Sequence, residues 1–140
     1  MNYQTLNLLY KCSKEYSHKK IRLEDLTDTE CMICSYIYFN PNCSQEDVSI
    51  NSRIDKTTVG KAVNSLEKKD CVRKTKDEND RRINHLSLTQ NGNTKIKKLL
   101  TLHDTWLQQI LSVLLEDEKL QFEEYCNRLL KKAEMLSKNI

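Results

Sequence analysis

The scarcity of glycine and proline most constrains what this chain can fold into. Its 140 residues include two glycines, Gly60 and Gly92, and one proline, Pro41. Because these residues supply most tight turns, we expect few turns and many helices, arranged in a single domain. A phosphate-cradling loop needs closely spaced glycines. The distance between Gly60 and Gly92 therefore excludes P-loop and dinucleotide-binding enzymes.

The net charge and the length of the apolar runs indicate which partners the protein could bind and in which cell compartment it belongs. With 23 Lys+Arg against 20 Asp+Glu, the net charge of +3 permits nucleic-acid binding without requiring it. No apolar run approaches the roughly 18 residues that span a bilayer, and the first residues lack a secretory signal pattern. We therefore expect a cytoplasmic protein without a membrane partner, whose six cysteines are reduced thiols.

Four helices are predicted in the first half of the chain. Apolar residues at spacings of three and four predict a helix over about 2–17. A second begins at the capping box Thr27-Asp28-Thr29-Glu30 and ends near Pro41. A third runs from Ser44 to about residue 52, and Asp55 caps a fourth with one apolar face and one polar, basic face. The last two predict a helix-turn-helix.

The pattern then changes to strands and returns to helix. Residues 71–74 and 83–88 predict two strands around the charged segment 77–82, which is a hairpin wing. Two long helices follow, over about 89–115 and 117–138. Their apolar side chains exceed what one lobe can readily cover, which favours a symmetric partner chain. The alternative is that these helices close on the core of the monomer.

The stretch from Leu26 to Gly92 contains several short motifs. Its most specific part is the wing, where the pattern D-x-R-x-x-x-V-x-L-T-x-x-G is matched from Asp80 to Gly92, with Leu86 as a conservative change. Further motifs are Leu26-Thr27, Ser44-Gln45, Asp55-Lys56-Thr57-Thr58-Val59 and Leu66-Glu67-Lys68-Lys69. Together these motifs resemble the MarR family of bacterial transcriptional regulators. The resemblance implies a mainly α fold with a small β-hairpin wing, and a homodimer. Residues 27–89 would form the winged helix-turn-helix lobe, and residues 1–26 and 90–140 the dimerisation helices of one domain.

The expected partner is double-stranded DNA with a roughly palindromic operator. A recognition helix presents side chains to base edges, and other polar groups hold phosphates. The candidate base contacts are Thr57, Thr58, Lys61 and Asn64, and the candidate phosphate contacts are Ser44, Gln45, Lys56 and Lys68. The resemblance implies that Asp80 pairs with Arg82, which leaves Arg81 nearer the tip of the wing. One of these two arginines would reach the minor groove.

Three positions depart from the family pattern. Gly60 replaces a hydroxyl residue in the recognition helix, so a direct hydroxyl contact there is lost. Lys61 replaces an arginine, so a point charge stands where the family has the planar guanidinium fork that suits bidentate reading of guanine. Asp70 replaces a glycine before the first strand, where it can adopt a left-handed conformation at moderate cost.

Candidate sensing residues are cysteines and aromatic side chains. Cys31 and Cys34 spell C-x-x-C inside a helix, and we interpret them as buried core thiols. No metal site or cofactor is expected. Cys12 is the candidate redox sensor, because peroxide-sensing members of the family carry a reactive cysteine in the N-terminal region. A small-molecule pocket is the other hypothesis, with simple core packing as its alternative; its candidate lining is Tyr16, Cys34, Tyr38 and Trp106.

The leading hypothesis is a dimeric, sequence-specific DNA-binding regulator, a repressor controlled by a ligand or by thiol state, and not an enzyme. A second hypothesis is a winged-helix module that binds protein and not DNA, which the modest net charge and the acidic wing motivate. A third is a small thiol oxidoreductase that uses Cys31 and Cys34.

Overall fold

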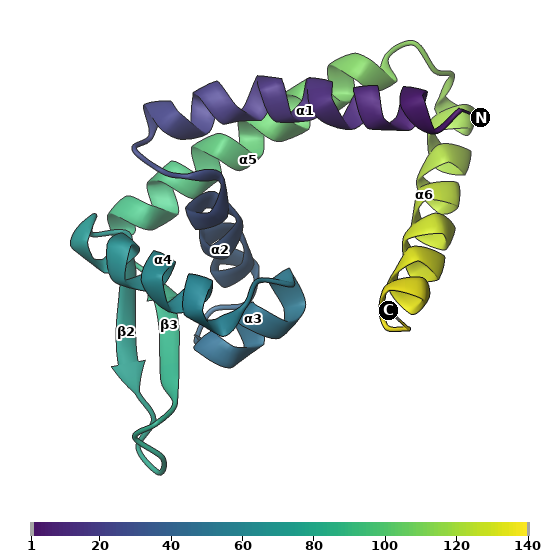
Figure 1. The fold of residues 1–140 in the computed structure, drawn as a ribbon. Coiled ribbons are helices and arrows are strands. Elements are labelled where there is room, and N and C mark those ends of the chain that lie inside the picture. The colour runs from purple at the N-terminus through teal and green to yellow at the C-terminus, as the bar shows by residue number, and fades with distance from the viewer. Residues whose placement is uncertain (1, 140) are drawn as a thin grey trace. The chain divides into compact units, whose positions relative to one another are not determined.

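The computed structural model describes residues 2–139 and divides the chain into two compact units, one ending at Leu102 and one beginning at His103. The first unit contains α1 (Tyr3–Leu23), α2 (Asp28–Phe39), β1 (Cys43–Ser44), α3 (Gln45–Ser52), α4 (Lys56–Lys68), β2 (Val72–Lys76), β3 (Asn84–Leu88) and the first part of α5 (Gln90–Leu111) (Figure 1). The second contains the rest of α5 and α6 (Glu116–Ser137). The predicted fold, mainly helical with a small β wing, is confirmed.

Helices α2, α3 and α4 begin where the caps predict. Thr27 accepts a hydrogen bond from the backbone N–H of Glu30, and the Glu30 carboxylate accepts one from the N–H of Thr27, both at 3.1 Å. Ser44 and Asp47 form the same reciprocal box at the start of α3. Asp55 caps α4 by accepting from the N–H of Thr58 at 2.9 Å. These caps satisfy backbone donors that a helix leaves unpaired.

The first helix is longer than predicted. It was expected to end near Ser17, but α1 continues through His18, Lys19 and Lys20 to Leu23. Lysine is a good helix former, and the buried Ile21 anchors this last part of the helix. An apolar periodicity cannot reveal such a segment, because most of its side chains face solvent. The prediction for α5 errs in the other direction, since that helix ends at Leu111 and not near Leu115.

The sheet has three antiparallel strands in the order β1-β3-β2. Strands β2 and β3 form the predicted wing, in which Val72 pairs with Leu88 and Lys76 with Asn84. The hairpin extends beyond the helices of the first unit (Figure 1). Strand β1 was not predicted, since two residues are too few to show a period. It pairs Cys43 with Leu86 and so attaches the start of α3 to the wing.

A single core holds the first unit together. Its fully buried side chains come from α2, α3, α4, β3, α5 and the connections that precede α2 and β2, and the largest are Leu26, Ile33, Ile37, Leu66, Leu86, Ile96 and Leu99. Helix α1 lies antiparallel to the first part of α5, with the Tyr16 hydroxyl 3.4 Å from the Leu102 carbonyl oxygen (Figure 1). In the described part of the chain, no helix combines the length and the apolar character needed to cross a membrane.

The turn between α4 and β2 is packed against the start of α5. Asp70 adopts the left-handed conformation expected for it, with φ of 55°. A Cβ atom on Gly92 would lie 2.1 Å from the Cys71 carbonyl oxygen, so only glycine fits there. Thr89 donates to the Asp70 carbonyl oxygen at 2.6 Å and accepts from the N–H of Gly92 at 3.0 Å.

Candidate nucleic-acid interface

Helix α4 has one buried and one exposed face. Val59, Val63 and Leu66 are fully buried in the core. The exposed face carries Thr57, Lys61, Asn64 and Lys68, which follow one another at spacings of four, three and four. Such spacing lines up side chains on one side of a helix. The structure therefore places these four predicted DNA contacts in one row, away from the core.

The start of α4 is held by its own cap. The Thr58 hydroxyl donates to the Asp55 carboxylate at 2.7 Å, beside the backbone bond at 2.9 Å. These hydrogen bonds lower the pKa of Asp55, which therefore stays ionised. Thr58 thus has a structural role that the sequence analysis did not assign, while its methyl group remains available for apolar contact.

The ends of α3, α4 and β3 surround a surface cavity of about 420 Å³. Its lining brings together four of the predicted contact residues, Ser44, Gln45, Lys56 and Arg82, with Glu46, Ile83, Asn84 and His85. Lys56 and Glu46 form an exposed ion pair of 3.2 Å across this opening. Exposed pairs of this kind contribute little to stability, so Lys56 can exchange this partner for a phosphate at little cost.

Gln45 lies over Gly60. The nitrogen of its side-chain amide would be 3.4 Å from a Cβ atom at Gly60, which is van der Waals contact. Within residues 2–139, no hydrogen-bond donor reaches the buried amide oxygen of Gln45. The space left by the missing side chain at Gly60 is therefore bordered by a polar side chain from α3. No spacing rule could have connected these two residues.

Acidic residues of the wing accept hydrogen bonds that stabilise the hairpin. Arg82 donates twice to the Asp80 carboxylate through its guanidinium, each time at 3.0 Å, and once through its backbone N–H. These bonds lower the pKa of Asp80. The predicted Asp80–Arg82 pair is therefore present. Arg81 is exposed at the neighbouring position.

Asp77 and His85 connect the tip of the wing to its base. Asp77 accepts from the backbone N–H groups of Asn79 and Asp80, both at 2.9 Å. It also lies 2.8 Å from Nε2 of His85, whose Nδ1 is 3.2 Å from the carbonyl oxygen of Asn42. The Asp77 contact raises the pKa of His85 and lowers that of Asp77. Asp77 and Asp80 of the wing thus have structural partners.

Lys74 connects the wing to α4, which the sequence did not predict. From β2 it reaches across to α4, where Nζ lies 3.2 Å from the side-chain oxygen of Asn64 and 3.3 Å from the Glu67 carboxylate. It joins the wing to the exposed face of the recognition helix. The alternating pattern of the strand predicted only that this lysine would be exposed.

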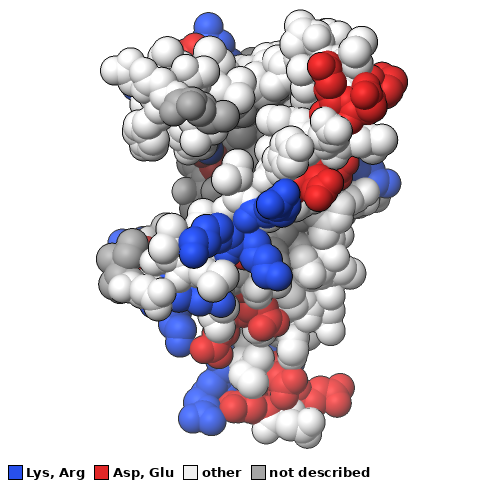
Figure 2. Space-filling view, turned by 90° about the vertical axis from the view of Figure 1, so that its right-hand side faces the viewer, with Lys and Arg blue, Asp and Glu red and all other residues white. Residues whose placement is uncertain are grey.

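Charge on the surface is mixed. On the face drawn in Figure 2, groups of Lys and Arg side chains alternate with groups of Asp and Glu side chains. This agrees with the small net charge of +3. Any attraction for DNA must therefore come from the local arrangement of cations and not from a uniformly positive surface.

The candidate sensing residues occupy different environments. Cys12 is exposed on α1, whereas Cys31 and Cys34 are buried, as predicted, and burial raises the pKa of both thiols. Tyr16 is half-buried, with the Lys20 ammonium 4.7 Å from its ring centre. Tyr38 is half-buried and packs edge-on against Phe39. Trp106 belongs to the second unit.

Among residues 2–139, no group of three or more His, Cys, Asp or Glu side chains is arranged to hold a metal ion.

A short helix, a turn and a helix with an exposed polar face, followed directly by a β-hairpin, define a winged helix-turn-helix protein. A model of the MarR family matches residues 26–83. The chain belongs to this family of transcriptional regulators. It is therefore a DNA-binding regulator and not an enzyme.

Three known proteins illustrate the relationship. The HTH-type transcriptional regulator BilQ of Clostridium symbiosum is 30% identical over 99 residues, 71% of this chain and 69% of the relative. The transcriptional repressor MprA of Escherichia coli is 24% identical over 127 residues, 89% of this chain and 72% of the relative. The S. aureus MepR–DNA complex has the same fold, with a TM-score of 0.82 at 21% identity, covering 94% of this chain and 98% of that one.

Proposed function

We propose that this protein is a homodimeric repressor that binds a roughly palindromic operator and is released by a small ligand or by thiol oxidation. The exposed row Thr57, Lys61, Asn64 and Lys68 on α4, beside an arginine-bearing wing, carries the proposal. Two similar proteins support it, because MprA is named a transcriptional repressor and MepR is solved in complex with DNA.

In this proposal, the side chains of α4 read base edges in the major groove. Lys61 donates as a point charge, and Asn64 can bond bidentately to adenine. The Thr58 methyl group suits a thymine methyl group. Lys56, Lys68, Ser44 and Gln45 hold phosphates. Arg81 or Arg82 reaches the minor groove, and Asp80 orients Arg82.

The homodimer is supported by apolar surface on the helices outside the winged lobe. Along its described length, Glu116–Ser137, α6 buries no residue within the single chain. Its exposed side chains include Leu120, Phe122, Tyr125, Leu129, Leu130, Met135 and Leu136. On α1, Tyr3, Leu6, Leu9 and Tyr10 are also exposed. Exposed apolar surface of this extent is typical of a protein–protein interface. A second copy of the chain is the simplest partner that would bury it.

Release through a thiol would use Cys12. A reactive thiol must be accessible and able to ionise. Cys12 is exposed, whereas burial raises the pKa of the thiols of Cys31, Cys34, Cys43 and Cys71. Release by a small molecule would use the half-buried aromatic residues Tyr16 and Tyr38, with Cys34 and Trp106 as further candidates.

Fluorescence anisotropy tests the proposal, with labelled double-stranded DNA from upstream of the protein's own gene and a scrambled duplex of equal length. We expect preference for the native duplex and a steep loss of affinity with salt, with a slope of about −0.9 per phosphate contact. Arg82→Ala should weaken binding by about tenfold or more, and Lys97→Ala on α5 is the charge-matched control. Binding indifferent to both sequence and salt contradicts the proposal.

Repeating the measurement after hydrogen peroxide, with Cys12→Ser beside the wild type, separates thiol release from ligand release.

A further inference from the structure

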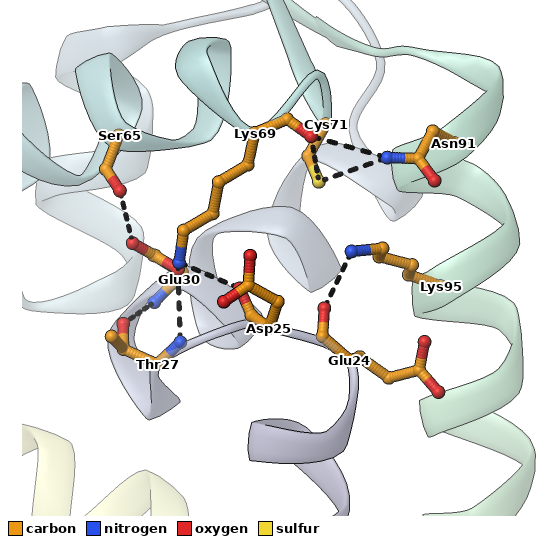
Figure 3. Close-up of polar contacts among 9 residues, drawn as sticks. All are labelled: Glu24, Asp25, Thr27, Glu30, Ser65, Lys69, Cys71, Asn91 and Lys95. Carbon is orange, nitrogen blue, oxygen red and sulfur yellow. Dashed lines mark hydrogen bonds and ion pairs between the residues drawn. The ribbon is translucent and has the colours of Figure 1, made fainter.

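A buried carboxylate lies between the recognition helix and the helices that precede it. Glu30, in the first turn of α2, is 4% exposed. It accepts hydrogen bonds from Lys69 and Ser65, both at 2.8 Å, and from the backbone N–H of Thr27 at 3.1 Å (Figure 3). Charged residues are rarely buried unless they are paired. Burial alone would raise the pKa of Glu30, but these partners together lower it, so the group is ionised at neutral pH.

Lys69 connects this carboxylate to a second element. It is the C-terminal cap residue of α4, and its ammonium group also donates to the Asp25 carbonyl oxygen at 2.8 Å (Figure 3). Asp25 lies in the connection between α1 and α2 and has a left-handed backbone conformation, with φ of 58°. The end of α4 is therefore joined to both α1 and α2.

The start of α5 is tied into the same region. Lys95 donates to the Glu24 carbonyl oxygen at 2.7 Å, and Lys98 pairs with the Glu24 carboxylate at 2.5 Å. The Asn91 side-chain amide donates to the Lys69 carbonyl oxygen at 3.4 Å, at the end of α4 (Figure 3), and to the Asp70 carbonyl oxygen at 3.2 Å. Polar contacts of fixed direction thus meet where α1, α2, α4 and α5 end or begin.

These polar contacts fix the orientation of α4, which the apolar core alone does not. The buried face of α4, Val59, Val63 and Leu66, is held by hydrophobic burial, which is non-directional. The Glu30–Lys69 pair holds the C-terminal end of the helix with defined donors and acceptors. A helix of 13 residues is about 20 Å long. Turning it by about 10° around that end would move its N-terminal residues by about 3.5 Å, close to the rise of one base pair.

We propose that the buried Glu30–Lys69 pair positions the recognition helix relative to α1 and α5, and thereby sets the spacing between half-sites that the dimer accepts. The inference rests on the proposed function, since it requires a dimer that binds two half-sites. Glu30 and Lys69 are positioning residues, because neither lies on the exposed row of α4. Two recognition helices about one turn of DNA apart must keep their separation to bind both half-sites, so an error in helix direction appears as altered spacing.

The test is selection of binding sites from one pool of random double-stranded DNA by the wild type, Glu30→Gln and Lys69→Gln. Folding of each variant is checked by circular dichroism. We expect the variants to select the same half-site bases as the wild type, but with a spacing that shifts or broadens by about one base pair. Affinity for the wild-type spacing should fall about tenfold. Lys97→Gln is the charge-matched control, because Lys97 is an exposed lysine of α5 outside the group of polar contacts around Glu30 and Lys69.

The possible outcomes are distinct. Folded variants that select the wild-type spacing overturn the inference and leave the proposed function standing. Variants that lose base preference at constant spacing also overturn it, because the pair then acts on contacts and not on position. A wild type that selects no sequence from the pool removes the proposed function, and the inference falls with it. If Glu30→Gln does not fold, Lys69→Arg, which keeps the charge but changes its reach, decides by the same spacing measurement.

Discussion

Gly92 shows how one residue can be required for packing alone. The first turn of α5 approaches the chain so closely that a Cβ atom there would lie 2.1 Å from the Cys71 carbonyl oxygen. That carbonyl is backbone and also accepts a hydrogen bond from the N–H of Thr89 at 3.0 Å, so it cannot easily move. The family pattern predicted a glycine at this position, and the structure supplies the physical reason.

We expect Gly92→Ala to lower the free energy of unfolding by about 1–3 kcal/mol, the usual cost of overpacking. Urea denaturation measures it. Gly60→Ala is the matched control, since a Cβ atom at Gly60 would meet only the flexible Gln45 side chain at 3.4 Å. That change should be neutral or should stabilise the helix by up to about 1 kcal/mol. Equal losses for the two variants would contradict the packing argument.

At the scale of elements, the wing is an independent polar structure attached to the winged lobe. Its turn is held by Asp77, its arginine by Asp80, and its base by the contact of His85 with the Asn42 carbonyl oxygen. Asp47 also faces His85 and raises its pKa further. Because a hairpin of this length is marginally stable alone, these contacts order it.

The His85–Asp77 contact makes the order of the wing dependent on pH. The pKa of His85 is raised above its ordinary value of 6.5. Its contribution is therefore complete below pH 6.5 and is lost as the pH rises through the folded-state pKa. NMR titration of His85 should give a pKa above 6.5 that returns towards 6.5 in Asp77→Asn. Asp80→Asn, which leaves the His85 partner in place, should keep it raised. A wild-type value at or below 6.5 would show that the contact does not form in solution.

At the scale of the whole molecule, the unburied face of α6 is the main feature that one chain leaves incomplete. Phe122, Tyr125, Leu129 and Leu136 recur at spacings of three, four and seven, which places them on one side of the helix. Each is more than 40% exposed in the single chain. The proposed homodimer would cover this stripe.

We expect Leu129→Glu to weaken dimerisation, because a charge would replace a side chain buried between two copies. Sedimentation equilibrium should show monomers at concentrations where the wild type is dimeric, with a parallel loss of DNA affinity. Lys131→Glu is the control. Two residues further along, its side chain points roughly 200° away around the helix. Equal behaviour of the two variants would place the interface elsewhere.

Local features were predictable because their causes are local. The capping boxes at Thr27 and Ser44 and the cap at Asp55 are read within four residues, and each lies at an observed helix start. The wing pattern from Asp80 to Gly92 identified both the hairpin and the family. Errors arose where local signals are weak, as in the charged last turns of α1 and the two-residue strand β1.

The sequence by itself determined the class of fold, the family, the buried face of α4 and the residues exposed opposite it, because all of these follow from periodicity, caps and a short motif. Only the tertiary structure decided which distant side chains meet. Glu30 and Lys69 are separated by 39 positions, and Lys74 reaches Asn64 from another element. No spacing encodes such pairs, because they depend on how the elements pack and not on neighbours in the chain. The tertiary structure also shows what each of the two glycines faces: the Cys71 carbonyl oxygen at Gly92 and the Gln45 side chain at Gly60.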